Sequence, residues 1–182
     1  MFALLLSIEI FITIIVCILL IILAVLIFLK NKKKHNTFLA NVMDILMKNK
    51  MENIQYNTNK KMYTFSFKYH EKQYFIKIIN GGKKKGIVMT NPTTIFIKTY
   101  SSNYGPATKS EYATKLENFL SEPLGGTKII LIKNNMLRIT KYINENELEE
   151  VKYNVPSFNT YIVQEKDLNN YLEYIKIKDK KK

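Results

Sequence analysis

Residues Ile10 to Leu29 form twenty consecutive uncharged positions, most of them Ile, Leu or Val. As a helix that rises about 1.5 Å per residue, this run is about 30 Å long, which matches the hydrocarbon core of a bilayer. Soluble domains rarely contain an apolar run of this length. We therefore expect a transmembrane helix in residues 1–29, embedded in the lipid bilayer.

A cleaved signal peptide is the alternative explanation for an apolar stretch near an N-terminus. Signal peptides have basic residues before a shorter apolar region and small residues at the cleavage site. Residues Met1 to Ser7 contain no Lys or Arg, and no A-x-A-like site precedes Lys30. The sequence therefore favours an uncleaved anchor.

The charges beside the apolar run predict its orientation. Four lysines follow the run, Lys30, Lys32, Lys33 and Lys34, whereas Glu9 is the only charged residue before it. Because lysine-rich flanks stay on the cytoplasmic side, we expect a single-pass protein of the cell membrane with its N-terminus outside and its C-terminal domain in the cytoplasm. Residues 30–36 would be a basic juxtamembrane linker. Glu9 is expected at the outer interface, and contact with a partner helix is the alternative.

The remainder of the chain is strongly basic. From Lys30 to Lys182 it contains 28 basic and 14 acidic residues, a net charge of +14, and Arg138 is the only arginine. Lysine acts as a point charge, whereas arginine is the usual residue for bidentate recognition of phosphates and bases. This composition predicts non-specific attraction to anionic lipid headgroups or nucleic acid, although an AT-rich gene would give the same lysine content without such a role.

Three groups of lysines are the candidate binding residues. One follows the apolar run, one lies between glycines, and one ends the chain in a basic tail over residues 176–182. Besides the four juxtamembrane lysines named above, they are Lys83, Lys84, Lys85, Lys180, Lys181 and Lys182. Each basic residue near an anionic leaflet contributes about 1 kcal/mol of attraction. Another membrane protein is a further possible partner.

Hydrophobic periodicity predicts one α/β domain of the α+β type in residues 37–175. Helices are expected over 37–50, from a capping box at Thr108 and Glu111 to Pro123, and over 167–175. Strands are expected over 62–70, 73–79, 93–100, 128–133, 137–143 and 160–164. Loops are expected over 51–61, 80–86 and 101–107, with a tight turn at Asn134-Asn135 and one or two helical turns over 145–151. The helices should flank a mixed, mainly antiparallel sheet, with 128–133 at its centre because that run is apolar on both faces.

Residues suited to catalysis are scarce. His35 and His70 are the only histidines and Cys17 is the only cysteine, so the sequence predicts no metal site and no intramolecular disulfide. The glycine- and lysine-rich segment Gly81–Gly86 lacks the G-K-[ST] ending of a phosphate-binding loop. We expect no cofactor and no catalytic set.

The predicted order from Thr37 to Lys133 is helix, three strands, helix, strand. This order resembles the αβββαβ core of the restriction-endonuclease-like, or PD-(D/E)xK, superfamily. The resemblance implies an acid-x-Lys tripeptide that helps to bind a divalent metal, and its place here is Phe96-Ile97-Lys98, with Phe96 instead of the acid. A nuclease of this kind would use Glu71, Lys77 and Lys98 with a metal that activates water.

The sequence thus favours a membrane-anchored protein with a basic, non-catalytic binding domain. Its ligand would be anionic lipid, nucleic acid or a protein partner. A membrane-anchored, metal-dependent nuclease is the first alternative, and a small structural subunit of a membrane complex is the second.

Overall fold

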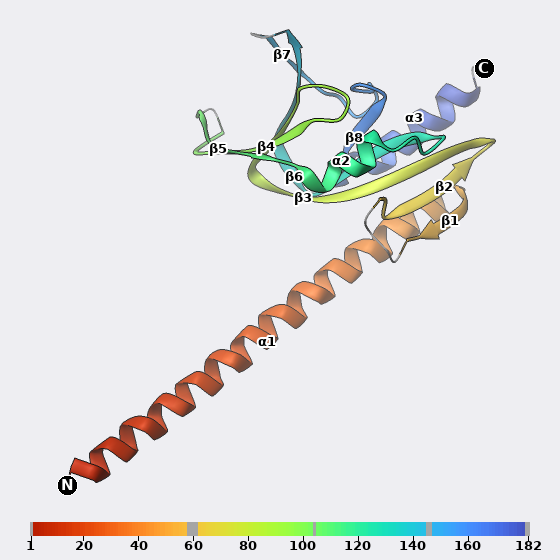
Figure 1. The fold of residues 1–182 in the computed structure, drawn as a ribbon. Helices are drawn as coiled ribbons and strands as arrows, with labels where there is room; N and C mark the ends of the chain where they lie inside the picture. Colours follow the sequence, from red (N-terminus) through yellow and green to blue (C-terminus); the bar gives the residue numbers. More distant parts are fainter. Residues whose placement is uncertain (1, 58–61, 104, 145–146, 181–182) are drawn as a thin grey trace. The chain divides into compact units, whose positions relative to one another are not determined.

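The computed structural model describes residues 2–57, 62–103, 105–144 and 147–180, without the side chains of residues 2–12, 179 and 180 (Figure 1). The chain consists of two units, residues 1–42 and 43–182. The helices are α1 Phe2–Lys48, α2 Thr114–Ser121 and α3 Leu168–Lys180, with a short 3₁₀ turn, η1, over Glu165–Asp167. The strands are β1 Glu52–Tyr56, β2 Phe65–Tyr69, β3 Lys72–Met89, β4 Ile95–Tyr100, β5 Ala107–Tyr112, β6 Thr127–Asn144, β7 Glu147–Glu150 and β8 Thr160–Gln164.

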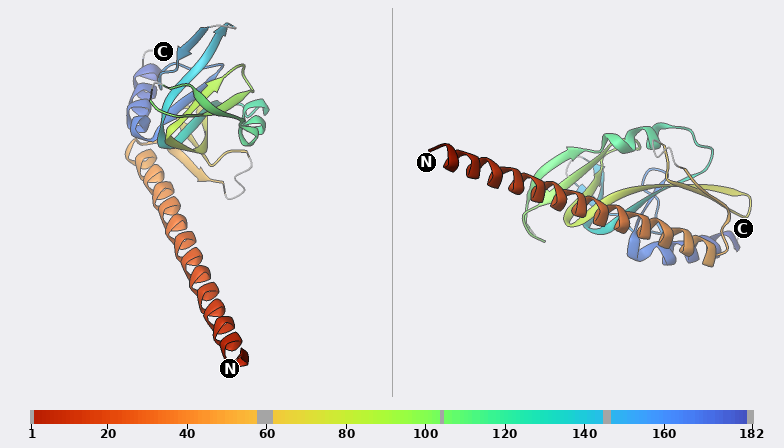
Figure 2. Two further views of the ribbon diagram at one scale, coloured as in Figure 1. Left: turned by 90° about the vertical axis from the view of Figure 1, so that its left-hand side faces the viewer. Right: turned by 90° about the horizontal axis from the view of Figure 1, so that it is seen from below.

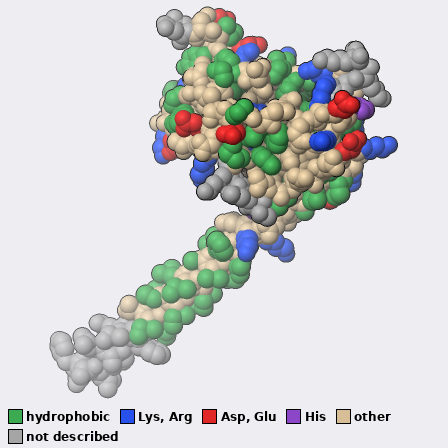
Figure 3. Space-filling model, turned by 45° about the vertical axis from the view of Figure 1, so that its right-hand side comes forward, with side chains coloured by type: hydrophobic (Ala, Val, Ile, Leu, Met, Phe, Trp, Pro, Cys, Tyr) green, Lys and Arg blue, Asp and Glu red, His purple; other side chains and the backbone are tan. Residues whose placement is uncertain are grey.

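Helix α1 is long and apolar enough to span a membrane. Within Thr13–Lys48, an 18-residue window has a mean hydropathy of 3.2, and none of the residues in that window is buried. Figure 3 shows its apolar side chains, followed by lysines. No Gly or Pro interrupts Phe2–Lys48, so nothing in the sequence breaks the helix. The expected linker over residues 30–36 is therefore helical, and the two helices expected over 1–29 and 37–50 are one.

Helix α1 ends in a Schellman motif within the second unit. Lys50 has a φ of 59°, its N–H donates to the Met47 carbonyl, and the Met51 N–H donates to the Leu46 carbonyl. Leu46 and Met51 are buried, which supplies the apolar contact that accompanies this motif. The segment after it forms β1 instead of the expected loop over 51–61.

Two 18-residue strands, β3 and β6, form the parallel centre of an eight-stranded sheet. Tyr74 to Met89 of β3 pairs with Thr127 to Lys141 of β6. At one end β2 and β1 extend the sheet beside β3, and β8 pairs with β6 in parallel. At the other end β4 and β5 lie beside β3, and β7 lies beside β6. The prediction of a mixed, mainly antiparallel sheet with residues 128–133 at its centre is confirmed.

The loop expected over 80–86 and the turn expected at Asn134-Asn135 are wrong. Both segments are strand, and the pairing register shifts there on each side of Gly82. A Cβ on Gly81 would lie 2.6 Å from the Asn134 carbonyl oxygen, so glycine lets the two strands approach. Asn134 has a φ of 57°, which asparagine tolerates. Residues typical of turns here form bulges in continuous strands.

The expected start of the second helix is also wrong. Thr108 and Glu111 lie in β5, where the Thr108 hydroxyl donates to the Thr99 carbonyl and Glu111 pairs with Lys109. Their side chains bond within the sheet instead of capping a helix, and α2 begins only at Thr114. The helical turns expected over 145–151 are replaced by strand β7, with residues 145–146 outside the described part.

The sheet lies between α2 and α3 (Figures 1 and 2). On one face, Leu116, Phe119 and Leu120 of α2 pack in a core cluster with residues such as Phe75 and Ile130. On α3, the expected stripe of Leu168, Tyr171, Leu172 and Ile175 is buried, which confirms that prediction. Helix α3 continues to Lys180, so most of the expected basic tail is helical.

The restriction-endonuclease-like core stays a prediction. The structure has five strands, β1 to β5, between α1 and α2, whereas the sequence predicted three. Strands β2, β3 and β4 lie where those three were expected.

Candidate functional site

The lysines of the glycine-flanked segment form an exposed basic ridge. Lys83, Lys84 and Lys85, called here the lysine ridge, are exposed in the bulged middle of β3. Lys85 pairs with Thr99 of β4, and the pairing with β6 passes from Gly82 to Gly86. The segment is therefore fixed at its ends by strand pairing and is not a hairpin loop.

The other predicted binding lysines are distributed over both units. Lys30, Lys32, Lys33 and Lys34 are exposed on α1 in the first unit. The backbone of Lys180 belongs to α3, whereas its side chain and both Lys181 and Lys182 lie outside the described residues.

The residues suggested for a nuclease are not brought together. Lys98 on β4 pairs with Gly86, and Lys77 lies nine residues before Gly86 on β3. At about 3.3 Å per residue, this separation is about 30 Å along the strand. Glu71 is further away still, in the turn before β3.

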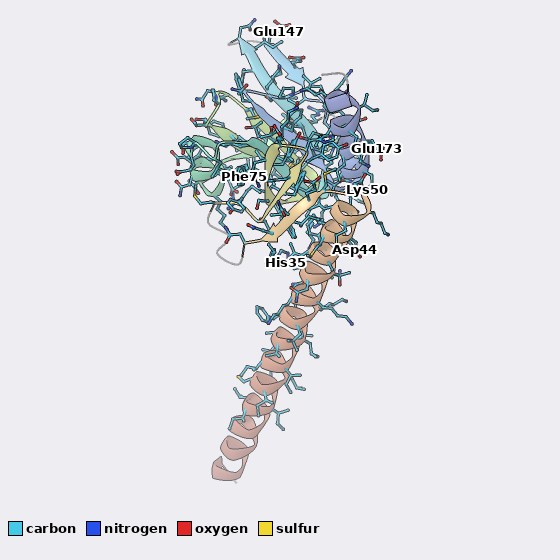
Figure 4. The ribbon with its side chains drawn as sticks, turned by 90° about the vertical axis from the view of Figure 1, so that its right-hand side faces the viewer. His35, Asp44, Lys50, Phe75, Glu147 and Glu173 are labelled. Carbon is cyan, nitrogen blue, oxygen red and sulfur yellow. The ribbon has the colours of Figure 1, made fainter. Side chains whose placement is uncertain are left out.

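The acidic residues do not form a metal site either. Glu147 lies on β7 and Glu173 on α3, well apart in Figure 4. Among the described residues, no group of three or more His, Cys, Asp or Glu side chains is placed to hold a metal ion.

Lys77 is a buried lysine, with 7% of its surface exposed. It lies on the same face of β3 as Phe75, which packs against α2. This burial lowers the pKa of Lys77 from its ordinary value, because an apolar environment disfavours the ammonium form.

The only arginine has a structural role. Arg138 donates from Nη2 to the Asn103 carbonyl at 2.6 Å, and its guanidinium carbon lies 5.1 Å from the centre of the Tyr100 ring. Tyr100 covers Gly86, where a Cβ would approach its ring to 2.9 Å. Arg138 therefore fixes the segment between β4 and β5.

A cleft of about 190 Å³ lies between α3 and the beginnings of β3 and β6. Helix α3 contributes one face of the cleft, because its lining residues are three, four and seven positions apart. The strands contribute through register, since Tyr74 pairs with Thr127 and Tyr161 pairs with Ile129. The complete lining, called here the tyrosine–lysine cleft, is Lys72, Tyr74, Thr127, Tyr161, Tyr171, Tyr174, Ile175 and Lys178.

Three tyrosines form the aromatic wall of this cleft. The ring centroid of Tyr161 lies 5.1 Å from that of Tyr171 and 6.4 Å from that of Tyr174. Tyr74 stacks on Phe67 at 4.9 Å with an interplanar angle of 5°. These contacts hold the rings in fixed orientations.

Lys178 is anchored on this wall. Its Nζ donates to the Tyr161 hydroxyl at 3.1 Å and lies 5.8 Å and 5.7 Å from the ring centroids of Tyr161 and Tyr174. The hydrogen bond with Tyr161 raises the pKa of Lys178 above its ordinary value. The ammonium group therefore stays charged over the physiological range.

The sequence predicted some of the residues that α3 contributes to this cleft but did not predict the cleft itself. Tyr171 and Ile175 were expected on the buried side of α3, and the same stripe continued to Lys178 would have placed a lysine beside them. The strand tyrosines gave no such signal, because their proximity depends on the pairing of β3, β6 and β8.

Comparisons with known protein families, with characterised proteins and with solved structures find no match.

Proposed function

We propose that this chain is a single-pass protein of the cell membrane whose basic, non-catalytic cytoplasmic domain binds anionic lipid headgroups of the same membrane. The observation that carries the proposal is α1, an apolar helix with exposed side chains that is followed at once by Lys30 and three further lysines. Exposed apolar side chains over this length are stable in lipid and not in water.

The anchor supports lipid as the ligand because it limits the distance of the domain from the membrane. Residues 30–42 join the apolar run to the second unit. Even a fully extended chain of that length reaches only about 45 Å. Headgroups are therefore always near the domain, and weak lysine contacts benefit from this high local concentration.

The kind of basic residue also supports a lipid surface over nucleic acid. Sequence-specific reading of bases and bidentate phosphate recognition depend largely on arginine. Arg138 is bound to Asn103 and Tyr100 within the domain. The lysine ridge instead presents three flexible point charges, which suit a fluid anionic surface.

The test compares two variants of the full chain in nanodiscs. One replaces Lys83, Lys84 and Lys85 by Gln, and the other replaces the dispersed exposed lysines Lys68, Lys115 and Lys166 by Gln. Both lose three charges. The measurement is the rate at which an acetylating reagent modifies the remaining lysines, in phosphatidylcholine nanodiscs with and without phosphatidylserine.

We expect phosphatidylserine to protect the lysine ridge of the unmodified chain by up to about 150-fold, since three residues contribute about 3 kcal/mol. Lysines near the ridge should lose their protection in the variant that lacks the three ridge lysines. They should keep it in the variant that lacks the three dispersed lysines. High salt should remove it because it screens the charges. Equal acetylation rates in both kinds of nanodisc would contradict the proposal, and protection by added DNA alone would favour nucleic acid.

A further inference from the structure

We infer that the tyrosine–lysine cleft is a binding site for a phosphate group carried on a small organic stem. The inference rests on the proposed function in taking the ligand to be anionic. The inference differs from the proposed function because it assigns a discrete, saturable site. This site lies at the beginning of β3, whereas the end of β3 pairs with β4. The lysine ridge is not part of this site.

The charge of the cleft favours an anion. Lys72 and Lys178 supply two ammonium groups, and none of the eight lining residues, all of which the structure describes, is acidic. The C-terminal end of α3 carries about half a negative charge, which the two ammonium groups outweigh. The charged side chains that line the cleft are therefore both cationic.

The tyrosine wall prepares one of these ammonium groups for a ligand. Contacts with Tyr161 and Tyr174 hold the Lys178 Nζ in place, and an ammonium has three N–H donors. A donor remains for a ligand oxygen after the two tyrosine contacts. Because Lys178 itself occupies the position over the two rings, the wall is not left open for a cationic ligand.

The size and chemistry of the remaining lining define the rest of the ligand. The cleft has a volume of about 190 Å³, which is well above the volume that a single water molecule requires. This space fits a phosphate with a short stem. Tyrosine and Thr127 hydroxyls can donate to phosphate oxygens, while Ile175 and the rings contact the carbon atoms of the stem. A glycerol phosphate meets these requirements, whether free in solution or as the head of phosphatidic acid.

The test uses the full chain in phosphatidylcholine nanodiscs, with glycerol 3-phosphate as the probe. Calorimetry measures the affinity, and the NMR signals of the tyrosine rings locate the site. Lys178→Gln should weaken binding at least about tenfold, because it removes a charge-assisted hydrogen bond. Lys72→Gln should also weaken binding. Because Lys72 is exposed, this substitution tests the same site without disturbing the packing of the core. Tyr161→Phe keeps the ring but frees Lys178, and should weaken binding about threefold.

Lys166→Gln is the matched control, since Lys166 is exposed on η1 and loses the same charge. It should change the affinity less than twofold. Competition by phosphatidic acid nanodiscs would assign the site to lipid headgroups, and binding of glycerol 3-phosphate without that competition would assign it to a soluble phosphate ester. Either result supports the inference.

Absence of saturable binding, or binding that Lys178→Gln and Lys72→Gln leave unchanged, would overturn it. Because phosphatidylcholine nanodiscs carry no net charge, the affinity for glycerol 3-phosphate measured in them does not depend on whether the lysine ridge binds anionic lipid.

Discussion

Gly86 illustrates how single residues of this chain are used for close contacts. The residue separates the lysine ridge from the buried part of β3, in a segment where glycines predict a turn. In the structure it pairs with both Lys98 and Arg138, and the Tyr100 ring covers it. The ring fills the space that a side chain would occupy.

We predict that Gly86→Ala lowers the free energy of unfolding by about 1–3 kcal/mol, as other overpacked sites do. The added Cβ would lie 2.8 Å from the Arg138 carbonyl oxygen and 2.9 Å from Tyr100 Cε2. Denaturation of the full chain in detergent, followed by circular dichroism, measures the change. Ser110→Ala on the exposed edge strand β5 is the control and should change the value by less than about 0.5 kcal/mol. An unchanged midpoint for Gly86→Ala would contradict the close packing.

At the scale of elements, the chain reuses turn-forming residues inside long strands. The local preferences of Gly81, Gly82 and Asn134 predict loops. In the structure these residues form local bulges, and β3 and β6 each continue through them as strands of 18 residues. Local patterns identified β2, β4, β8 and α3 because each contains several buried or half-buried apolar or aromatic side chains. They did not identify β1, β5 and β7, because most side chains of these edge strands are exposed and polar.

The membrane-spanning role of helix α1 can be tested by substitution. Replacing Ile18 and Ile22 by Arg should remove the chain from the membrane fraction, since each arginine at the centre of a spanning helix costs about 2.5–3.5 kcal/mol. The measurement is the share of protein that stays in the membrane pellet after an alkaline carbonate wash.

The matched control introduces two arginines at Asn31 and Asn36, outside the apolar run. That variant should remain in the pellet. If the Ile18 and Ile22 variant also stays in the pellet, or if the unmodified chain is washed off, α1 is not a membrane anchor.

At the scale of the whole molecule, the candidate ligand site depends on strand pairings that the sequence of any single segment does not predict. The tyrosine–lysine cleft joins Tyr74, Tyr161 and Tyr174, which belong to β3, β8 and α3. Their proximity depends on the parallel pairing of β3, β6 and β8, which sequence periodicity does not specify. By contrast, the anchor is predictable because its length and composition are local properties of one segment.

The most direct test of the account is the side of the membrane on which the domain lies. Cys17 is the only cysteine, so a Cys17→Ser background allows single cysteines to report their location. In that background, Lys84→Cys should react with a membrane-impermeant maleimide only after the cells are permeabilised, whereas Phe2→Cys should react in intact cells. The reverse pattern, or reaction of both cysteines in intact cells, would contradict a domain anchored on the cytoplasmic face.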